Sequence, residues 1–275
     1  MVEVKGSKGL NTLSVEDELL DEDDVLRIID DPVLALLPWI LMTLAIGPFS
    51  FTVGMAIGLA ASALIVALQW WREERPRIFE LADLLLFALL VLIGLTGDHP
   101  LMNWMNNHCD EVSNAGLTVI AFGSVLIGYP FTAEYTKYRL APLSYRVRHR
   151  VDRLSSYAWG WAFLVATIAG GYGEWVMNQP NNFWTAWTLQ TLPLIWAWLY
   201  IRWVDRRAIA TVPEYADERR PWEVCVRDGA AWTVISGLIG LFVGNEKSHI
   251  LGWWFIAVGL LVVTWTSIRL RRLEW

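Results

Sequence analysis

The sequence contains few of the residues from which catalytic and metal sites are built. It has two Cys and four His in 275 residues, and neither the CxxC nor the HxxxH spacing of zinc sites occurs. A Gly-rich phosphate loop, a Ser-His-Asp set and a nucleophile elbow are also missing. We therefore predict no catalytic, cofactor-binding or metal-binding residues and no enzyme activity. Internal duplication is not evident either, which weakens an inverted-repeat transporter without excluding it.

The positions of the His and Cys residues exclude two further features. A buried haem or chlorophyll needs a ligand such as His at mid-membrane depth. All four His lie between or at the ends of the apolar stretches: His99, His108, His149 and His249. We therefore expect no cofactor. Cys109 and Cys225 are predicted on opposite sides of a membrane, so they should not form a disulfide within the chain.

Charged residues are scarce, and long apolar stretches take their place. Hydrophobic residues make up 55% of the chain and charged residues 18%, with a mean hydropathy of +0.37, which is too apolar for a soluble domain of this length. Apolar windows of spanning length occur at 33–49, 51–71, 79–97, 114–134, 156–177, 183–203, 229–244 and 249–268. They predict an all-α, polytopic helical membrane protein with about eight transmembrane helices. The windows 33–49 and 229–244 are short, so either could be shallow or re-entrant.

The basic residues fall on one side of the predicted membrane. Six Lys or Arg lie between Lys137 and Arg153 and six between Arg202 and Arg227, and others lie in the 72–77 linker and the 269–272 tail. The opposite loops contain one cation, Lys247. Because Lys and Arg are retained on the cytoplasmic side, both termini are predicted to be cytoplasmic. The start of the chain lacks the pattern of a cleavable leader, so we expect no removable signal peptide.

Charge and hydropathy divide the chain into four segments. Residues 1–31 hold ten acidic against three basic residues, a net charge of −7, and are expected to form a disordered cytoplasmic tail. Residues 32–204 are predicted as a six-helix membrane domain, 205–228 as a cytoplasmic basic loop, and 229–275 as a C-terminal helical hairpin with a basic tail. Most of the 18 Trp residues map near the ends of the predicted helices, as expected for anchors at headgroup depth.

Four polar residues within or beside the apolar windows are candidates for function. Acidic residues at such positions cost free energy and suggest transport or proton relay. Glu80 and Asp83 lie in the first turns of the third predicted helix, where the helix dipole and the basic linker offer another explanation. Glu174 lies near the outer end of the fifth predicted helix. It either extends to the outer interface, which we favour, or shares a polar cleft with Gln190.

One outer loop contains the only cluster in the sequence of residue types that bind metals or transfer protons: Asp98, His99, His108, Asp110 and Glu111. The spacing of a structural zinc site is missing, so a solvated polar loop is the simpler interpretation.

Small residues recur on one face of two predicted helices: Gly54, Gly58 and Ser62 in one, and Gly240 and Gly244 in the other. Such faces let helix backbones approach closely. We expect them to pack within the protein, with a dimer interface as the alternative.

Four short motifs occur in the order and spacing of a known family. They are Gly94-Leu95-Thr96 before Asp98-His99, Gly128-Tyr129-Pro130-Phe131, Trp159-Gly160-Trp161-Ala162-Phe163, and Trp184 at the start of the sixth helix. In these motifs residues 33–204 resemble the intracellular septation protein A family of bacterial inner-membrane proteins. The chain departs from it at Ala186-Trp187-Thr188, where the family has a Phe-Lys-x-x-Gly pattern, and the acidic N-terminus and the 229–268 hairpin are additional. The resemblance implies a multi-pass protein of the bacterial inner (cytoplasmic) membrane. It also implies a role in septation and envelope synthesis through protein contacts, with no catalytic residues to transfer.

The predicted function is that of a non-catalytic, envelope-associated interaction or scaffold protein. Its acidic tail and basic loops would be the contact surfaces. The expected partners are the lipid bilayer, anionic lipid headgroups and other membrane proteins, and not nucleic acid. Two alternatives remain open: a small-solute or lipid transporter that uses Glu174, Glu80 or Asp83, and an accessory subunit of a larger membrane complex.

Overall fold

The computed structural model describes residues 36–46, 50–73, 76–137, 140–178, 183–218, 220–243 and 249–273, and within them the chain forms helices and no strands. The prediction of an all-α protein is confirmed. The longer helices are α3 (Leu37–Ile46), α4 (Phe51–Glu73), α5 (Ile78–Thr96), α7 (Cys109–Leu126), α9 (Tyr145–Gly171), α10 (Leu189–Ile209), α11 (Trp222–Val243) and α12 (His249–Leu273). The short elements are α6 (His99–Asn107), α8 (Ala133–Thr136), the π-helical η2 (Tyr172–Val176) and η3 (Phe183–Thr188), and the 3₁₀ helix η4 (Pro213–Glu218). The predicted acidic tail, residues 1–31, lies outside the described residues.

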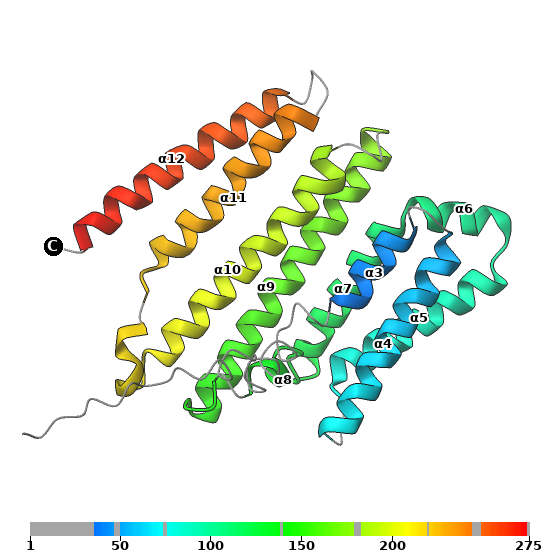
Figure 1. Cartoon of the computed structure of the whole chain (residues 1–275), viewed down its shortest axis with the longest axis horizontal. Coiled ribbons are helices and arrows are strands. Elements are labelled where there is room, and N and C mark those ends of the chain that lie inside the picture. The colour runs from blue at the N-terminus through cyan, green and yellow to red at the C-terminus, as the bar shows by residue number, and fades with distance from the viewer. Residues whose placement is uncertain are drawn as a thin grey trace, which may run out of the picture.

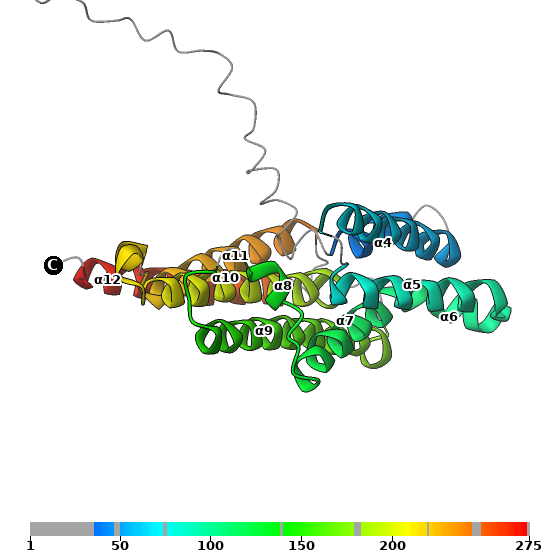
Figure 2. The same cartoon turned by 90° about the horizontal axis from the view of Figure 1, so that it is seen from below.

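From α7 to α12 the long helices lie side by side in the order of the chain, with α3, α4 and α5 grouped beside α7, and successive helices run in opposite directions (Figure 1). α4 packs against α3 and α5, and the series α7, α9, α10, α11 and α12 continues with each helix in contact with the next. α3 and α5 connect the first group to α7. Seen after a turn of 90°, the array is thin, with α4 on one side and α9 on the other (Figure 2). It is a flat slab of helices rather than a closed bundle.

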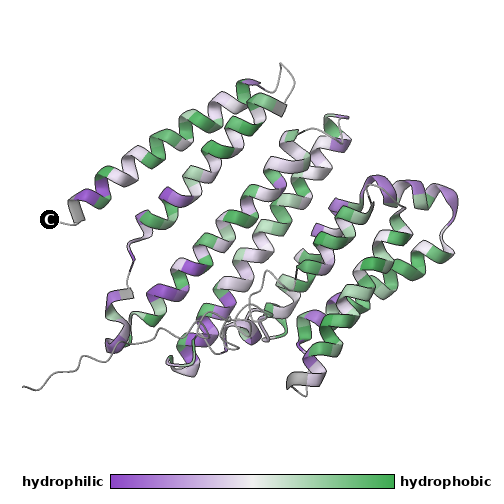
Figure 3. Cartoon of the chain, in the orientation of Figure 1, coloured by the Kyte–Doolittle hydropathy of each residue, from purple (hydrophilic) through white to green (hydrophobic). Residues whose placement is uncertain are grey.

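Four of these helices, α4, α5, α11 and α12, are long and apolar enough to cross a membrane. Apolar residues dominate the middle of the slab, and polar residues gather toward the helix ends (Figure 3). Large apolar side chains also point outward: Trp71 is 84% exposed, Leu126 83% and Phe242 88%. Because water disfavours such a surface and lipid accepts it, these features indicate a membrane protein.

The basic segments gather at one end of the slab. α4, α10 and α12 end there, and α5, α9 and α11 begin there (Figure 1). These are the helix ends that border the 72–77 linker, the two basic segments and the basic tail. The arrangement places the predicted cytoplasmic cations on a single face. The number of spans and the orientation of the termini remain predictions.

Two segments predicted as loops are largely helical. In the outer segment 98–113, α6 begins at His99, and the Asp98 carboxylate caps it by accepting a hydrogen bond from the Leu101 N–H at 3.0 Å. α7 then begins at Cys109 rather than at 114. In the segment 205–228, α10 continues to Ile209 and α11 begins at Trp222. Hydropathy detects the apolar part of a helix and not the polar turns that extend it, which explains both differences.

The two short apolar windows have different outcomes. The described part of 33–49 is α3, which has 10 residues. At 1.5 Å per residue it spans about 15 Å, half of a hydrocarbon core of roughly 30 Å. The 229–244 window, in contrast, belongs to the 22-residue α11, which is one of the four candidate spans. A re-entrant or shallow segment is therefore not needed for 229–244.

Two of the predicted small residues lie where helices pack within the protein. A Cβ on Gly58 of α4 would lie 2.8 Å from Cδ1 of Phe87 in α5, and one on Gly240 of α11 would lie 2.6 Å from Cη2 of Trp184 in η3. Both glycines therefore let large aromatic rings pack directly on a helix backbone. Gly244 lies outside the described residues.

Candidate functional site

The outer ends of α7, α9 and α10 bring together a group of polar side chains. α9 ends in the π-helical η2, and α10 is preceded by the π-helical η3. Such π segments are frequent at functional sites. The side chains that meet there are His108, Glu111, Asn114, Glu174 and Gln190, which we call the outer polar cluster.

The side chains of His108 and Glu174 form a buried polar contact in the outer polar cluster. Nε2 of His108 lies 2.9 Å from Oε1 of Glu174, and the two side chains are only 10% and 14% exposed. Glu174 therefore turns into the protein. The sequence favoured the other possibility, that Glu174 extends to the outer interface. Nδ1 of His108 lies 2.7 Å from the Trp104 carbonyl oxygen, which can only accept, so Nδ1 is the donor. The Trp104 ring also stacks on the imidazole, with ring centroids 4.3 Å apart, and fixes its orientation.

Glu111, Asn114 and Gln190 extend the cluster from α7 to α10. Nδ2 of Asn114 donates a hydrogen bond to Oε1 of Gln190 at 3.1 Å. Gly170 of α9 leaves room for this contact, because a Cβ there would lie 2.8 Å from Nε2 of Gln190 and would also meet the Glu111 carboxylate. Glu111 lies in the first turn of α7, outside the four candidate spans, and burial raises the pKa of its carboxyl. The charges of His108 and Glu174 also act on it.

Hydrogen-bonding groups in and beside the outer polar cluster have no partner among the described residues. These are Oε2 of Glu174 and the hydroxyls of Thr185 and Thr188 in η3. Thr185 lies against Gly173, where a Cβ would collide with its hydroxyl, and so borders the backbone next to Glu174. Buried polar atoms are normally paired, so the cluster has capacity to bind a proton, a water molecule or a small polar ligand.

Only two of the five outer-loop candidates belong to the cluster, namely His108 and Glu111. Asp98 caps α6, and His99 and Asp110 are exposed. In the part of the chain that the structure describes, no group of three or more His, Cys, Asp or Glu residues is arranged to hold a metal ion. The five residues therefore do not converge on one site.

Glu80 and Asp83 lie in a second polar group at the basic end of the slab. Oε1 of Glu80 accepts hydrogen bonds from Nε2 of Gln69 at 2.8 Å and from the Tyr135 hydroxyl at 2.7 Å. The Arg77 N–H donates to Oε1 of Gln69 at 3.1 Å, and its guanidinium lies 4.8 Å from the centre of the Tyr135 ring. These residues, the inner polar cluster, tie α5 to the end of α4 and to α8.

The carboxylates of the inner polar cluster are buried more deeply than capping would require. Glu80 is 3% and Asp83 1% exposed. The Trp39 indole faces Asp83, but no donor lies in normal hydrogen-bonding geometry to either Asp83 oxygen among the described residues, and the same holds for Oε2 of Glu80. The side-chain partners of Glu80 thus come from α4 and α8, and the helix dipole alone does not account for its position.

The sequence identified the acidic members of both clusters, together with His108 and Gln190, but not Gln69, Asn114 or Tyr135. Gln69 could have been found as a polar residue near the end of an apolar run. Asn114 and Tyr135 carry no such signal, because their role depends on contacts with residues distant in the sequence.

The chain was also compared with known proteins. Searches against protein-family models, curated proteins and solved structures found no match. Functional proposals for this protein therefore depend on the geometry of its own residues.

Proposed function

We propose that this protein is a multi-pass protein of the bacterial cytoplasmic membrane that moves protons or a small cationic solute through the outer polar cluster. The observation that supports this proposal is the buried pair of His108 and Glu174, with Nε2 and Oε1 2.9 Å apart. Ionisable residues inside a membrane protein are costly and typically mark ion or proton pathways. An inward-facing Glu174 favours transport over the scaffold role predicted from the sequence.

The 2.9 Å contact between Nε2 of His108 and Oε1 of Glu174 needs a proton on one of the two atoms, because two lone pairs would otherwise face each other. Because Nδ1 of His108 donates to the Trp104 carbonyl, only Nε2 faces Glu174. Either Nε2 carries a proton and donates it to the carboxylate, or Glu174 carries the proton and donates it to Nε2. Loss of that proton would leave a lone pair facing a carboxylate, which is unfavourable. A cation that binds Glu174 can take the place of the proton, and this exchange is the basis of coupled movement.

The charge of the cluster favours a cation over an anion. Two carboxylates, Glu111 and Glu174, face one histidine, and the carbonyl groups of Asn114 and Gln190 are neutral ligands for positive charge. In the proposed topology eight helices span the membrane and the basic end is cytoplasmic. The outer polar cluster then lies at the periplasmic end of the slab, and the inner polar cluster with Glu80 and Asp83 lies at the cytoplasmic end.

Proton flux into proteoliposomes tests the proposal. The purified protein is reconstituted with an internal pH-sensitive dye, and a potassium diffusion potential drives proton entry. Glu174→Gln and His108→Gln should each reduce the flux at least about tenfold. Each variant replaces one of the two side chains that exchange the proton with an amide, which does not titrate. Glu214→Gln is the matched control, since Glu214 is an exposed acid on η4 at the other end of the slab. Wild-type flux in Glu174→Gln would refute transport through this cluster.

A second candidate function is an interaction or scaffold protein, or an accessory subunit of a larger membrane complex. The thin slab supports it, because Trp161, Trp175 and Trp187 are 59%, 70% and 66% exposed and available to other membrane helices. The resemblance to the septation protein A family implies the same role. Deletion of residues 1–28 should then reduce partner recovery in crosslinking without changing helix content, and Glu174→Gln should leave recovery unchanged. Full recovery after the deletion would argue against this role of the tail.

A further inference from the structure

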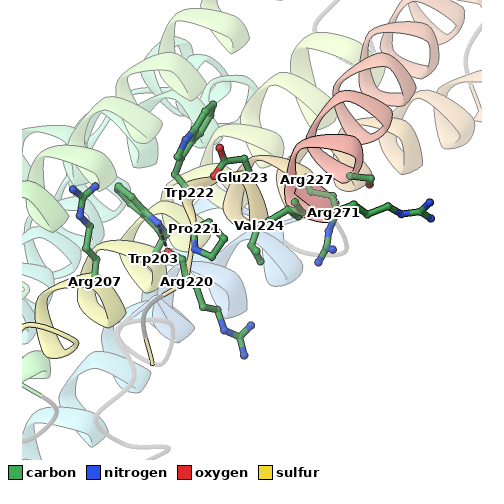
Figure 4. A pocket seen from close by; sticks show the side chains of 11 residues that line it. Trp203, Arg207, Arg220, Pro221, Trp222, Glu223, Val224, Arg227 and Arg271 are labelled. Carbon is green, nitrogen blue, oxygen red and sulfur yellow. Dashed lines mark hydrogen bonds between the residues drawn. The ribbon is translucent and has the colours of Figure 1, made fainter. Parts of the chain in front are cut away.

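A large groove lies at the basic end of the slab, between the end of α10, the start of α11 and the end of α12. Its volume is about 1050 Å³. Figure 4 shows the side chains that line it, and the six that matter here are Trp203, Arg207, Arg220, Trp222, Arg227 and Arg271. We call it the arginine groove. It is separate from both polar clusters.

Most of the positive charge in the arginine groove has no acidic partner among the residues that the structure describes. Glu223, the acidic residue of the lining, is paired with Arg269 at 3.0 Å, and Arg227 is paired with Asp228 at 3.1 Å. Arg207 lies over the Trp203 ring, 5.2 Å from its centre. Within the described residues neither Arg207, Arg220 nor Arg271 has an acidic partner. Three guanidinium groups thus share one groove without counter-charges, which favours an anionic ligand.

The position of the groove indicates where that anion comes from. The groove lies at the ends of α11 and α12, which are two of the four candidate spans. Trp222 and Trp265 flank Arg269 there, with its guanidinium 5.8 and 5.4 Å from their ring centres, and both rings are more than 40% exposed. Tryptophan and arginine at the end of a spanning helix mark headgroup depth. Exposed apolar side chains such as Ile268 continue from this point along α12.

We propose that the arginine groove binds the headgroup phosphate of an anionic phospholipid. In Figure 4 the side chains of Arg207, Arg220 and Arg271 extend in different directions, so binding would turn their guanidinium groups toward the phosphate. A planar guanidinium can then donate two parallel hydrogen bonds to its oxygens. Trp203 and Trp222 would lie at the glycerol level, and the acyl chains along the apolar surfaces of α11 and α12. A free phosphate ion would use the guanidinium groups alone. The site is independent of the proposed transport function.

The test compares two variants, each of which lacks three exposed arginines at the same end of the slab. The groove variant is Arg207→Gln/Arg220→Gln/Arg271→Gln. The matched control is Arg146→Gln/Arg150→Gln/Arg153→Gln, because these arginines are exposed at the start of α9 and do not line the groove. Binding of phosphatidylglycerol is measured by titration into protein held in phosphatidylcholine nanodiscs. Helix content and melting temperature without phosphatidylglycerol establish that both variants are folded.

The groove variant should bind phosphatidylglycerol about tenfold more weakly than the control, which corresponds to ~1.4 kcal/mol. The control should remain close to wild type. Equal weakening in the two variants would overturn the proposal, because it would mean attraction to surface charge without a site. Inorganic phosphate should not compete with the lipid, and competition would overturn the lipid as the source of the anion. If the groove variant does not fold, the triple Arg→Lys variant replaces it, and its charge without the planar fork should still weaken binding severalfold.

Discussion

Replacement of Gly58 by Ala should destabilise the packing of α4 against α5. The added Cβ would lie 2.8 and 2.9 Å from Cδ1 and Cζ of Phe87, whereas carbon atoms in contact are normally about 3.5–4.0 Å apart. The Phe87 ring has little room to move, because it is fully buried and packs on Trp39 with ring centroids 4.6 Å apart. Overpacking of this kind costs about 1–3 kcal/mol.

Gly123→Ala is the matched control for this substitution. Gly123 lies in α7, and a Cβ there would have no neighbour within 4 Å. Both variants gain the same helix propensity, about 1 kcal/mol, so their difference isolates the packing cost. Since a change of 1 kcal/mol shifts the melting temperature by roughly 2–4 °C, Gly58→Ala should melt about 2–12 °C below Gly123→Ala. Thermal unfolding in detergent measures both.

Equal melting temperatures for the two variants would refute the packing argument and would mean that Gly58 faces lipid. A second substitution locates the strain. Phe87→Leu in the Gly58→Ala background should recover part of the lost stability, because Leu lacks the ring atoms that the new Cβ meets. No recovery would place the strain at another contact.

Two further predictions concern topology and cysteine reactivity. Reporter fusions after residues 106 and 178 should report the outer side and fusions after 145 and 215 the cytoplasm, and a mixed pattern would contradict the eight-span topology. Cys109 should react slowly with a membrane-impermeant thiol reagent, because it is 5% exposed and burial raises the pKa of its thiol to about 12, which leaves little thiolate. Asn103→Cys, on the exposed surface of α6, should react rapidly from outside, and equal rates at the two positions would contradict the burial of Cys109.

The apolar helices could be predicted from the sequence because hydropathy and length are local properties. The third window was placed at 79–97 and α5 occupies Ile78–Thr96, and the last window and α12 both begin at His249. The polar ends were less predictable. α9 begins at Tyr145, within a segment rich in arginine, because a helix continues beyond lipid wherever its backbone hydrogen bonds can form.

The partners within the polar clusters could not be predicted, because they depend on how distant helices pack. Glu174 and Gln190 were recognised as candidates, and a shared cleft was one of two possibilities. That His108 is the partner of Glu174 follows only from the contact of α9 with α7, and from the break between α6 and α7 at His108. The arginine groove could not be predicted for the same reason, since its cations come from α10, from α11 and the segment before it, and from α12.

Gly170 of α9 and Gly173 of η2 give the strongest argument that the outer polar cluster is more than a by-product of packing. A helix pair that needed only stability would fill the space between its helices with apolar side chains. Here Gly170 leaves that space to Glu111 and Gln190, and Gly173 leaves it to the hydroxyl of Thr185. Glycine within a helix also costs about 1 kcal/mol relative to alanine, and each buried carboxylate adds a desolvation cost. Two glycines and two carboxylates at one place therefore lower stability without improving packing, which is the pattern expected where a site for a proton or cation is retained.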